Sequence, residues 1–171
     1  MNQHVSFLFT SLLTDDCIAR GKALLDGGVR YLGGTNETYG NINTSDSLWV
    51  IRDLVFNQKK YTLRQLNDAM LANFNGYEAL RKDCLNCDKY GNDLETADTM
   101  ANDLYEFVAK GVRNRGIAIG MQYFLIVISN NQLNTEWGNR TAASPDGRLS
   151  CMYMNPANNP QGGANKSGPT A

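Results

Sequence analysis

Side chains able to do chemistry gather around one tight turn near the C-terminal end of the sequence. Pro145-Asp146-Gly147 is a strong turn signal, because proline presets φ and glycine accepts conformations that other residues avoid. Arg140 and Arg148 flank this turn. A planar guanidinium group can bond loop carbonyls or bind a substrate anion. Both roles stay open for the two arginines, and we favour the loop-fixing role because tight turns leave backbone carbonyls to satisfy.

The cysteines are the second group of reactive side chains. Cys84 and Cys87 form a C-x-x-C pair, whereas Cys17 and Cys151 lie far from it in the sequence. A zinc site would need further ligands, and the one histidine, His4, is also remote. We therefore interpret the cysteines as reduced structural thiols and expect no metal site.

Composition and charge exclude several classes of partner. With 16 Lys and Arg against 17 Asp and Glu, the chain lacks the basic surface that nucleic acid or an anionic membrane would require. The longest apolar run, residues 117–128, is too short to span a bilayer. The N-terminal region has no basic segment followed by a small-residue cleavage site, which favours a cytoplasmic protein.

Helical periodicity predicts most of the elements that must position the turn. We expect one helix over residues 5–25 and, after the loop "GGTNETYGNIN", a second helix capped by Thr44 or Ser45, with Asp46 in its first turn. The apolar stripe of that second helix is Leu48, Ile51, Leu54 and Val55. Three more helices are predicted, over residues 62–73 with a Thr62–Gln65 capping box, 77–85 and 95–113.

The apolar run 117–128 predicts a buried strand that leads toward the turn. A strand followed by a polar loop is typical of an α/β barrel, in which functional groups follow the strand ends, so residues 130–148 are the expected place for function. Tyr123 and Ser129 are candidates for the barrel interior, with an even chance of facing the helices. Beyond Ser150 the chain is polar and predicts a loose tail without helix or strand.

Six segments in order make the sequence similar to a known family. They are "LLTDDCIARGKALLDGGVRY", "NINTSDSLWVIRDLVF", "TLRQLNDAMLANFNGYEALR", "KYGND", "TAASPDGR" and "KSGPTA". Together they resemble the glycyl radical enzymes of the pyruvate formate-lyase family. The most specific pieces are Asp46-Ser47 of "DSL", Pro145 to Arg148 of "PDGR", and Gly168-Pro169 of "GPTA".

The resemblance implies an incomplete, helix-rich section of a ten-stranded α/β barrel. Residues 1–150 would be the barrel section, and residues 151–171 a polar loop leading toward a glycyl radical domain. In that family, an activating enzyme with S-adenosylmethionine and an iron-sulfur cluster creates a radical on a glycine. The radical passes to a barrel cysteine and then to a small-molecule substrate. Expected partners are therefore the rest of the barrel, the radical domain and the activating enzyme.

The departures from the family pattern concern the radical itself. The Arg-Val-Ser/Thr-Gly-Tyr type of motif that bears the radical glycine does not occur, and none of the cysteines has the context of the thiyl cysteine. Cys84 and Cys87 are expected on an outer helix and loop. We therefore expect no catalytic residue and no bound cofactor in this chain, and an inactive chain when it is alone.

Two functions follow as hypotheses. The first is a fragment of a glycyl radical lyase or acyltransferase, such as a formate acetyltransferase, a dehydratase or a C–N lyase, of anaerobic metabolism. The second is a non-catalytic binding or assembly module derived from that family. A barrel section also leaves strand edges open, so residues 117–128 should promote association of the isolated chain.

Overall fold

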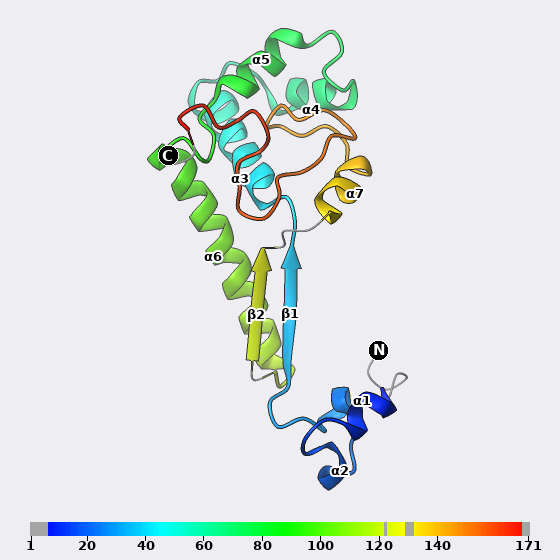
Figure 1. Cartoon of the computed structure of the whole chain (residues 1–171). Coiled ribbons are helices and arrows are strands. Elements are labelled where there is room, and N and C mark those ends of the chain that lie inside the picture. Colours follow the sequence, from blue (N-terminus) through cyan, green and yellow to red (C-terminus); the bar gives the residue numbers. More distant parts are fainter. Residues whose placement is uncertain (1–6, 122, 129–131, 169–171) are drawn as a thin grey trace. The chain divides into compact units, whose positions relative to one another are not determined.

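The computed structural model describes residues 7–121, 123–128 and 132–168 (Figure 1). The chain forms two compact units. The first comprises Met1–Asn36 and Lys110–Val127, and the second comprises Glu37–Ala109 and Ile128–Ala171.

Helices dominate the described part of the chain. In chain order the elements are α1 (Leu8–Leu12), α2 (Cys17–Arg20), the 3-10 turn η1 (Leu24–Asp26), β1 (Gly33–Thr38), α3 (Asn41–Val50), the π-helical stretch η2 (Ile51–Asn57), α4 (Leu63–Leu71), α5 (Glu78–Asn86), α6 (Glu95–Ala118), β2 (Tyr123–Ile128) and α7 (Leu133–Asn139).

The single helix predicted over residues 5–25 is wrong. Three short helical segments replace it, because the backbone leaves the helical region at Asp16 (φ 73°) and again at Gly21 (φ 60°). The Asp16 carboxylate binds the Arg30 guanidinium with both oxygens, at 3.0 and 3.1 Å. This local ion pair holds the chain in a turn where periodicity alone favoured a continuous helix.

The loop predicted before the second helix is a strand in its first half. Residues Gly33–Thr38 form β1, which pairs with β2 in a two-stranded sheet whose strands run in the same direction (Figure 1). A side chain at Gly34 would meet the Met121 side chain at 3.2 Å, so this position has little room for more than glycine. Glycine and asparagine have low strand propensity, and the prediction failed because pairing with a distant segment overrides that propensity.

The predicted strand 117–128 is only half correct. The predicted helix over 95–113 exists and extends further, through Ala118, and the strand begins at Tyr123. Gly116 allows Phe124 of β2 to pack closely against this helix, because a Cβ at Gly116 would lie 1.9 Å from the Phe124 ring. The run is not fully buried either, since Ile119 is 73% and Leu125 46% exposed.

The second helix begins earlier than predicted. α3 starts at Asn41 after Gly40, whose φ of 69° ends the preceding segment. Thr44 and Ser45 are not caps, because their hydroxyl groups donate backward to the carbonyls of Gly40 and Ile42. Asp46 is consequently a mid-helix residue, and the expectation that it lies in the first turn is wrong.

The core of the second unit is apolar and formed mainly by α3, η2, α4 and α5. Its buried members are Val50, Leu54, Leu66, Ala69, Phe74, Leu80, Cys84 and Ala143. Leu54 confirms part of the predicted stripe, whereas Leu48 is exposed. The capping box of α4 is confirmed: Gln65 N donates to Thr62 Oγ1, and Thr62 N donates to the Gln65 side chain. Cys84 lies in α5 and has no exposed surface, so its thiol is on the face of this helix that packs into the core.

None of the helices described is both long and apolar enough to cross a membrane.

The exposed apolar side chains of residues 117–128 lead to a prediction about solution behaviour. We expect the purified chain to bind a hydrophobic dye and to self-associate, because exposed apolar surface favours association. The double variant Ile119→Ser/Leu125→Ser should reduce both dye fluorescence and the associated fraction in analytical ultracentrifugation. Leu71→Ser, at an exposed leucine of α4, is the matched control and should change neither. A monomeric wild-type chain that does not bind the dye would contradict this expectation.

Candidate functional site

The predicted turn at Pro145-Asp146-Gly147 is present and tightly closed. Gly147 N donates to Ser144 O at 3.0 Å, and Ser144 N donates to Arg148 O at 3.0 Å. Gly147 has a φ of 93°, and a Cβ there would lie 2.8 Å from the Leu85 side chain. Glycine is therefore required both for the turn and for its close approach to α5.

Asp146 connects the turn to α3. Its Oδ1 accepts hydrogen bonds from Ser144 Oγ at 2.5 Å and from Arg148 N at 3.2 Å, and its Oδ2 accepts from Asn43 Nδ2 at 2.7 Å. Asp146 N donates to Ser47 Oγ at 3.2 Å. The structure thus brings together the "DSL" and "PDGR" segments, which lie about a hundred residues apart in the sequence.

Arg148 is buried and bonded to the loop itself. Its Nη1 donates to Met152 O at 2.7 Å and to Leu149 O at 3.2 Å, and its Nη2 donates to Ala142 O. Its Nε donates to Ser144 Oγ at 3.2 Å. Burial lowers the pKa of this guanidinium from its ordinary value, although the Asp146 carboxylate opposes the shift. The Nη1 and Nη2 groups of this guanidinium therefore donate to backbone carbonyls of the loop.

Arg140 differs from the loop-fixing expectation. It is exposed, it pairs with the Glu136 carboxylate at 2.8 Å, and its guanidinium lies 5.9 Å from the Trp137 ring centre. This arginine follows the last residue of α7 and contacts side chains of that helix. It does not bond loop carbonyls in the described structure. Of the other two substrate candidates, Tyr123 begins β2, and Ser129 lies outside the described residues.

The tail packs against α3 through side-chain amides, so it is not loose as expected. Asn43 Oδ1 accepts from Asn155 N at 2.8 Å, and Asn43 N donates to Asn155 Oδ1 at 3.2 Å. Asn43 Nδ2 also donates to Gln161 Oε1 at 3.0 Å. Sequence reasoning missed Asn43, Asn155 and Gln161, because nothing in the sequence marks a buried amide. Gly168 N is bonded to Asn165 Oδ1 at 3.1 Å, and Pro169 lies outside the described residues.

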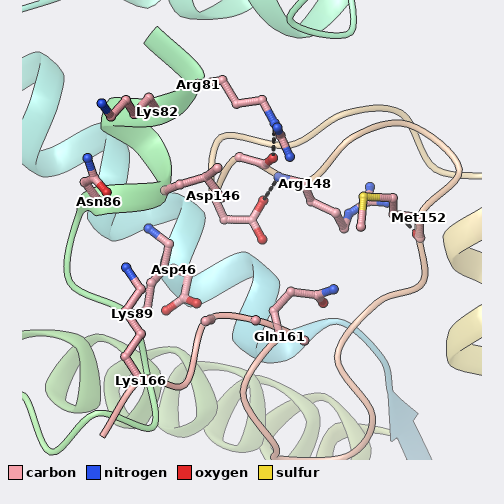
Figure 2. Close-up of a pocket in the computed structure, with 15 residues that line it drawn as sticks. Asp46, Arg81, Lys82, Asn86, Lys89, Asp146, Arg148, Met152, Gln161 and Lys166 are labelled. Atoms are coloured by element: carbon pink, nitrogen blue, oxygen red, sulfur yellow. Dashed lines mark hydrogen bonds between the residues drawn. The ribbon is translucent and has the colours of Figure 1, made fainter. Parts of the chain in front are cut away.

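A pocket of about 350 Å³ lies beside the turn (Figure 2). The turn, α3, α5 and the tail all contribute to its wall. The polar lining residues are Asp46, Arg81, Lys82, Asn86, Lys89, Asp146, Arg148, Gln161 and Lys166.

Asp46 has one satisfied and one unsatisfied oxygen in the wall of this pocket. The side chain is 1% exposed, its Oδ1 accepts from Tyr90 N at 3.0 Å, and its Oδ2 has no hydrogen-bond partner. Burial raises the pKa of this carboxyl group to about 7, against the opposing effects of the Tyr90 amide and the Lys89 ammonium. A carboxyl group with this pKa can hold or release a proton near neutral pH.

Two cations of the wall were not singled out by the sequence. Lys89 is buried, and its ammonium group donates to Cys84 O at 2.5 Å and to Cys87 O at 3.4 Å. Arg81 Nε donates to Gly147 O at 2.9 Å, which joins α5 to the turn (Figure 2). A lysine after a C-x-x-C pair carries no sequence signal that distinguishes it from a surface lysine.

Comparisons with known proteins identify the fold around this site. Residues 1–133 match the family model described as pyruvate formate lyase-like. The trans-4-hydroxy-L-proline dehydratase of Clostridioides difficile is 32% identical over 99% of this chain and 21% of its own length. The isethionate sulfite-lyase of Bilophila wadsworthia is 31% identical over 99% of this chain and 20% of its own length. A crystal structure of a glycyl radical enzyme from Archaeoglobus fulgidus superposes with a TM-score of 0.83 and 32% identity, covering 95% of this chain and 21% of that one.

The chain belongs to the pyruvate formate lyase-like family of glycyl radical enzymes. The predicted fold class, a helix-rich α/β section of the barrel of these enzymes, is confirmed. The chain spans about a fifth of the length of the curated relatives named above.

In the described part of the chain, no three His, Cys, Asp or Glu side chains gather closely enough to hold a metal ion. Burial raises the pKa of Cys84 to about 12 and that of Cys87 to about 11. Thiols with such high pKa values are protonated at neutral pH and are therefore poor nucleophiles and poor metal ligands. Cys84 is a buried member of the apolar core and Cys87 packs against that core, so the C-x-x-C pair is part of the packing between α5 and its neighbours.

Replacement of Asn43 tests the junction of α3, turn and tail. Asn43→Ala should lower the free energy of unfolding by about 3 kcal/mol, because it leaves buried groups of Asp146, Gln161 and Asn155 without partners. Urea denaturation measures this change. Asn57→Ala, at an exposed asparagine of η2, is the control and should change stability by less than about 0.5 kcal/mol. Equal stabilities of the two variants would show that the junction is not needed for folding.

Asp46 should make stability depend on pH. Its pKa is about 7 in the folded chain and has an ordinary value of 3.8, so between these values the folded state keeps a proton that the unfolded state has released. Protonated Asp46 therefore contributes its full stabilisation to the fold below about pH 4. This contribution is lost as the pH rises from about 4 to about 7, and the free energy of unfolding falls by about 4 kcal/mol at most. Urea unfolding at pH 5 and pH 8, compared with Asp46→Asn, isolates the effect. If the free energy of unfolding changed equally with pH in the wild-type chain and in Asp46→Asn, the predicted role of Asp46 would be contradicted.

Proposed function

We propose that this chain is a section of a glycyl radical lyase that acts on a small hydroxylated or sulfonated metabolite by radical chemistry. The observation that carries the proposal is the similarity along almost the whole chain to a trans-4-hydroxy-L-proline dehydratase and an isethionate sulfite-lyase. Both names describe eliminations from small molecules. This favours a lyase over formate acetyltransferase activity, which remains the second reaction type to test.

The role that we assign to the chain is structural support of the barrel next to its radical domain. Asn43 and Ser47 of α3 form one hydrogen-bonded unit with the turn and with Asn155 of the tail, which fixes where residues 151–168 run. A fixed path for this segment would position whatever follows it in the complete enzyme. Because catalysis needs the radical glycine and the thiyl cysteine placed together, we propose that the chain alone is inactive.

The proposal includes partners and a setting. The chain would work with the remainder of the barrel, the glycyl radical domain and an activating enzyme that uses S-adenosylmethionine and an iron-sulfur cluster. The setting would be anaerobic metabolism in the cytoplasm. No cofactor is assigned to the residues of this chain.

An assembly module is the alternative, and one observation favours it. Residues 7–18 expose several large apolar side chains, namely Phe7, Leu8, Phe9, Leu12, Leu13 and Ile18. A non-catalytic derivative that docks on a full-length relative would need a surface of this kind.

Electron paramagnetic resonance under anaerobic conditions tests the proposal. The purified chain, incubated with an activating enzyme, a reductant and S-adenosylmethionine, should give no organic radical signal and should consume neither trans-4-hydroxy-L-proline nor isethionate. A chimera of trans-4-hydroxy-L-proline dehydratase, with its matching section replaced by this chain, should still acquire the radical.

The same chimera with Asn43→Ala is the matched variant and should give less radical, because its turn and tail lose their anchor on α3. A radical or turnover with the isolated chain would contradict the proposed inactivity. A folded chimera that never acquires the radical would contradict the supporting role and would favour the assembly module.

A further inference from the structure

The pocket beside the turn has more positive than negative groups. Its wall holds the cations Arg81, Lys82, Lys89, Arg148 and Lys166 and the carboxyl groups Asp46 and Asp146. A partly enclosed cavity with an excess of one charge attracts ions of the opposite charge. The volume of about 350 Å³ lies in the range of pockets that take small molecules.

Most buried polar groups of the wall are already satisfied within the chain. Arg148 bonds loop carbonyls, Asp146 accepts three hydrogen bonds, and Lys89 bonds two carbonyls of α5 and the residue after it. Gln161 accepts from Asn43 and donates to Tyr153 O. These groups shape the pocket and have their hydrogen-bonding groups engaged within the chain.

One buried oxygen is different. Asp46 Oδ2 has no donor, although Asp46 is among the most deeply buried side chains of the second unit. A buried acceptor left without a partner costs about 1–3 kcal/mol, which a donor group entering the pocket would recover. Lys82 and Lys166, in contrast, are exposed side chains that line the pocket, so their ammonium groups are accessible to an anion.

We propose that this pocket binds a small organic anion that carries a hydroxyl group. The anionic group contacts Lys82 and Lys166 at the rim, within reach of the Arg81 guanidinium, and the hydroxyl group donates to Asp46 Oδ2. A phosphate, a sulfonate and a carboxylate share this chemistry. The site goes beyond the proposed function, because it uses residues of this chain alone and requires no radical.

Isothermal titration of the full chain with three probes tests the site. Glycerol 3-phosphate has both features, n-propyl phosphate lacks the hydroxyl groups, and glycerol lacks the anion. We expect saturable binding of glycerol 3-phosphate, about tenfold weaker binding of n-propyl phosphate, and no detectable binding of glycerol. Binding should weaken as salt is added, because salt screens the exposed lysines.

Variants locate the two halves of the site. Lys82→Gln and Lys166→Gln should each weaken the binding of glycerol 3-phosphate and of n-propyl phosphate by up to about fivefold. Lys59→Gln, at an exposed lysine of the same unit outside the pocket, is the control and should change neither of these two affinities. Asp46→Asn should remove the preference for glycerol 3-phosphate over n-propyl phosphate while retaining the binding of both.

Several results would overturn the site. These are the absence of saturable glycerol 3-phosphate binding, equal effects of the rim variants and Lys59→Gln, or equal affinity for the two phosphates in the wild-type chain. Because the titrations need no activating enzyme, they succeed or fail independently of the radical experiments. Glycerol 3-phosphate binding in a chain whose chimera acquires no radical would support the site and contradict only the enzyme role.

Discussion

The second unit depends on one buried side-chain amide, that of Asn43. Through its Nδ2 and Oδ1 atoms and its backbone N–H, it meets Asp146, Asn155 and Gln161, which are 103, 112 and 118 residues away in the sequence. Every one of these bonds is buried, where an unpaired polar group is costly and a satisfied network is rigid. The turn and the tail therefore share one anchor on α3.

The start of α3 decides which residues share that anchor. Because the helix begins at Asn41 after the left-handed Gly40, residues Asn43, Asp46 and Ser47 recur at three- and four-residue spacing on one side. Val50 continues the same side into the apolar core. One helical stripe thus changes from polar to apolar along its length, with the pocket and the turn at the polar end.

Sequence reasoning succeeded where structure is local and failed where it is not. The capping box at Thr62 and the turn at Pro145-Asp146-Gly147 depend on neighbouring residues, and both were predicted correctly. β1 was missed because its pairing partner is distant, and its Gly- and Asn-rich composition indicated a loop. Asp46 and Ser47 were found only through family resemblance, while Lys89 and Asn155 gave no signal because composition does not reveal burial of a polar side chain. The family of the chain could be predicted because six short motifs occur in the sequence in the order found in that family.

The tail shows that the lack of helix and strand is a poor guide to dispensability. Residues 155–168 have the composition of a disordered linker, yet Asn155 is 1% exposed, and Lys166 N bonds to Asn92 Oδ1 at 2.7 Å. A boundary chosen by composition for a shortened protein would fall at about Ser150. Such a deletion would remove Asn155 and Gln161, the partners of Asn43 in the tail, and would uncover the polar end of α3. The minimal folding unit is therefore set by side-chain amides in a segment that looks like a linker.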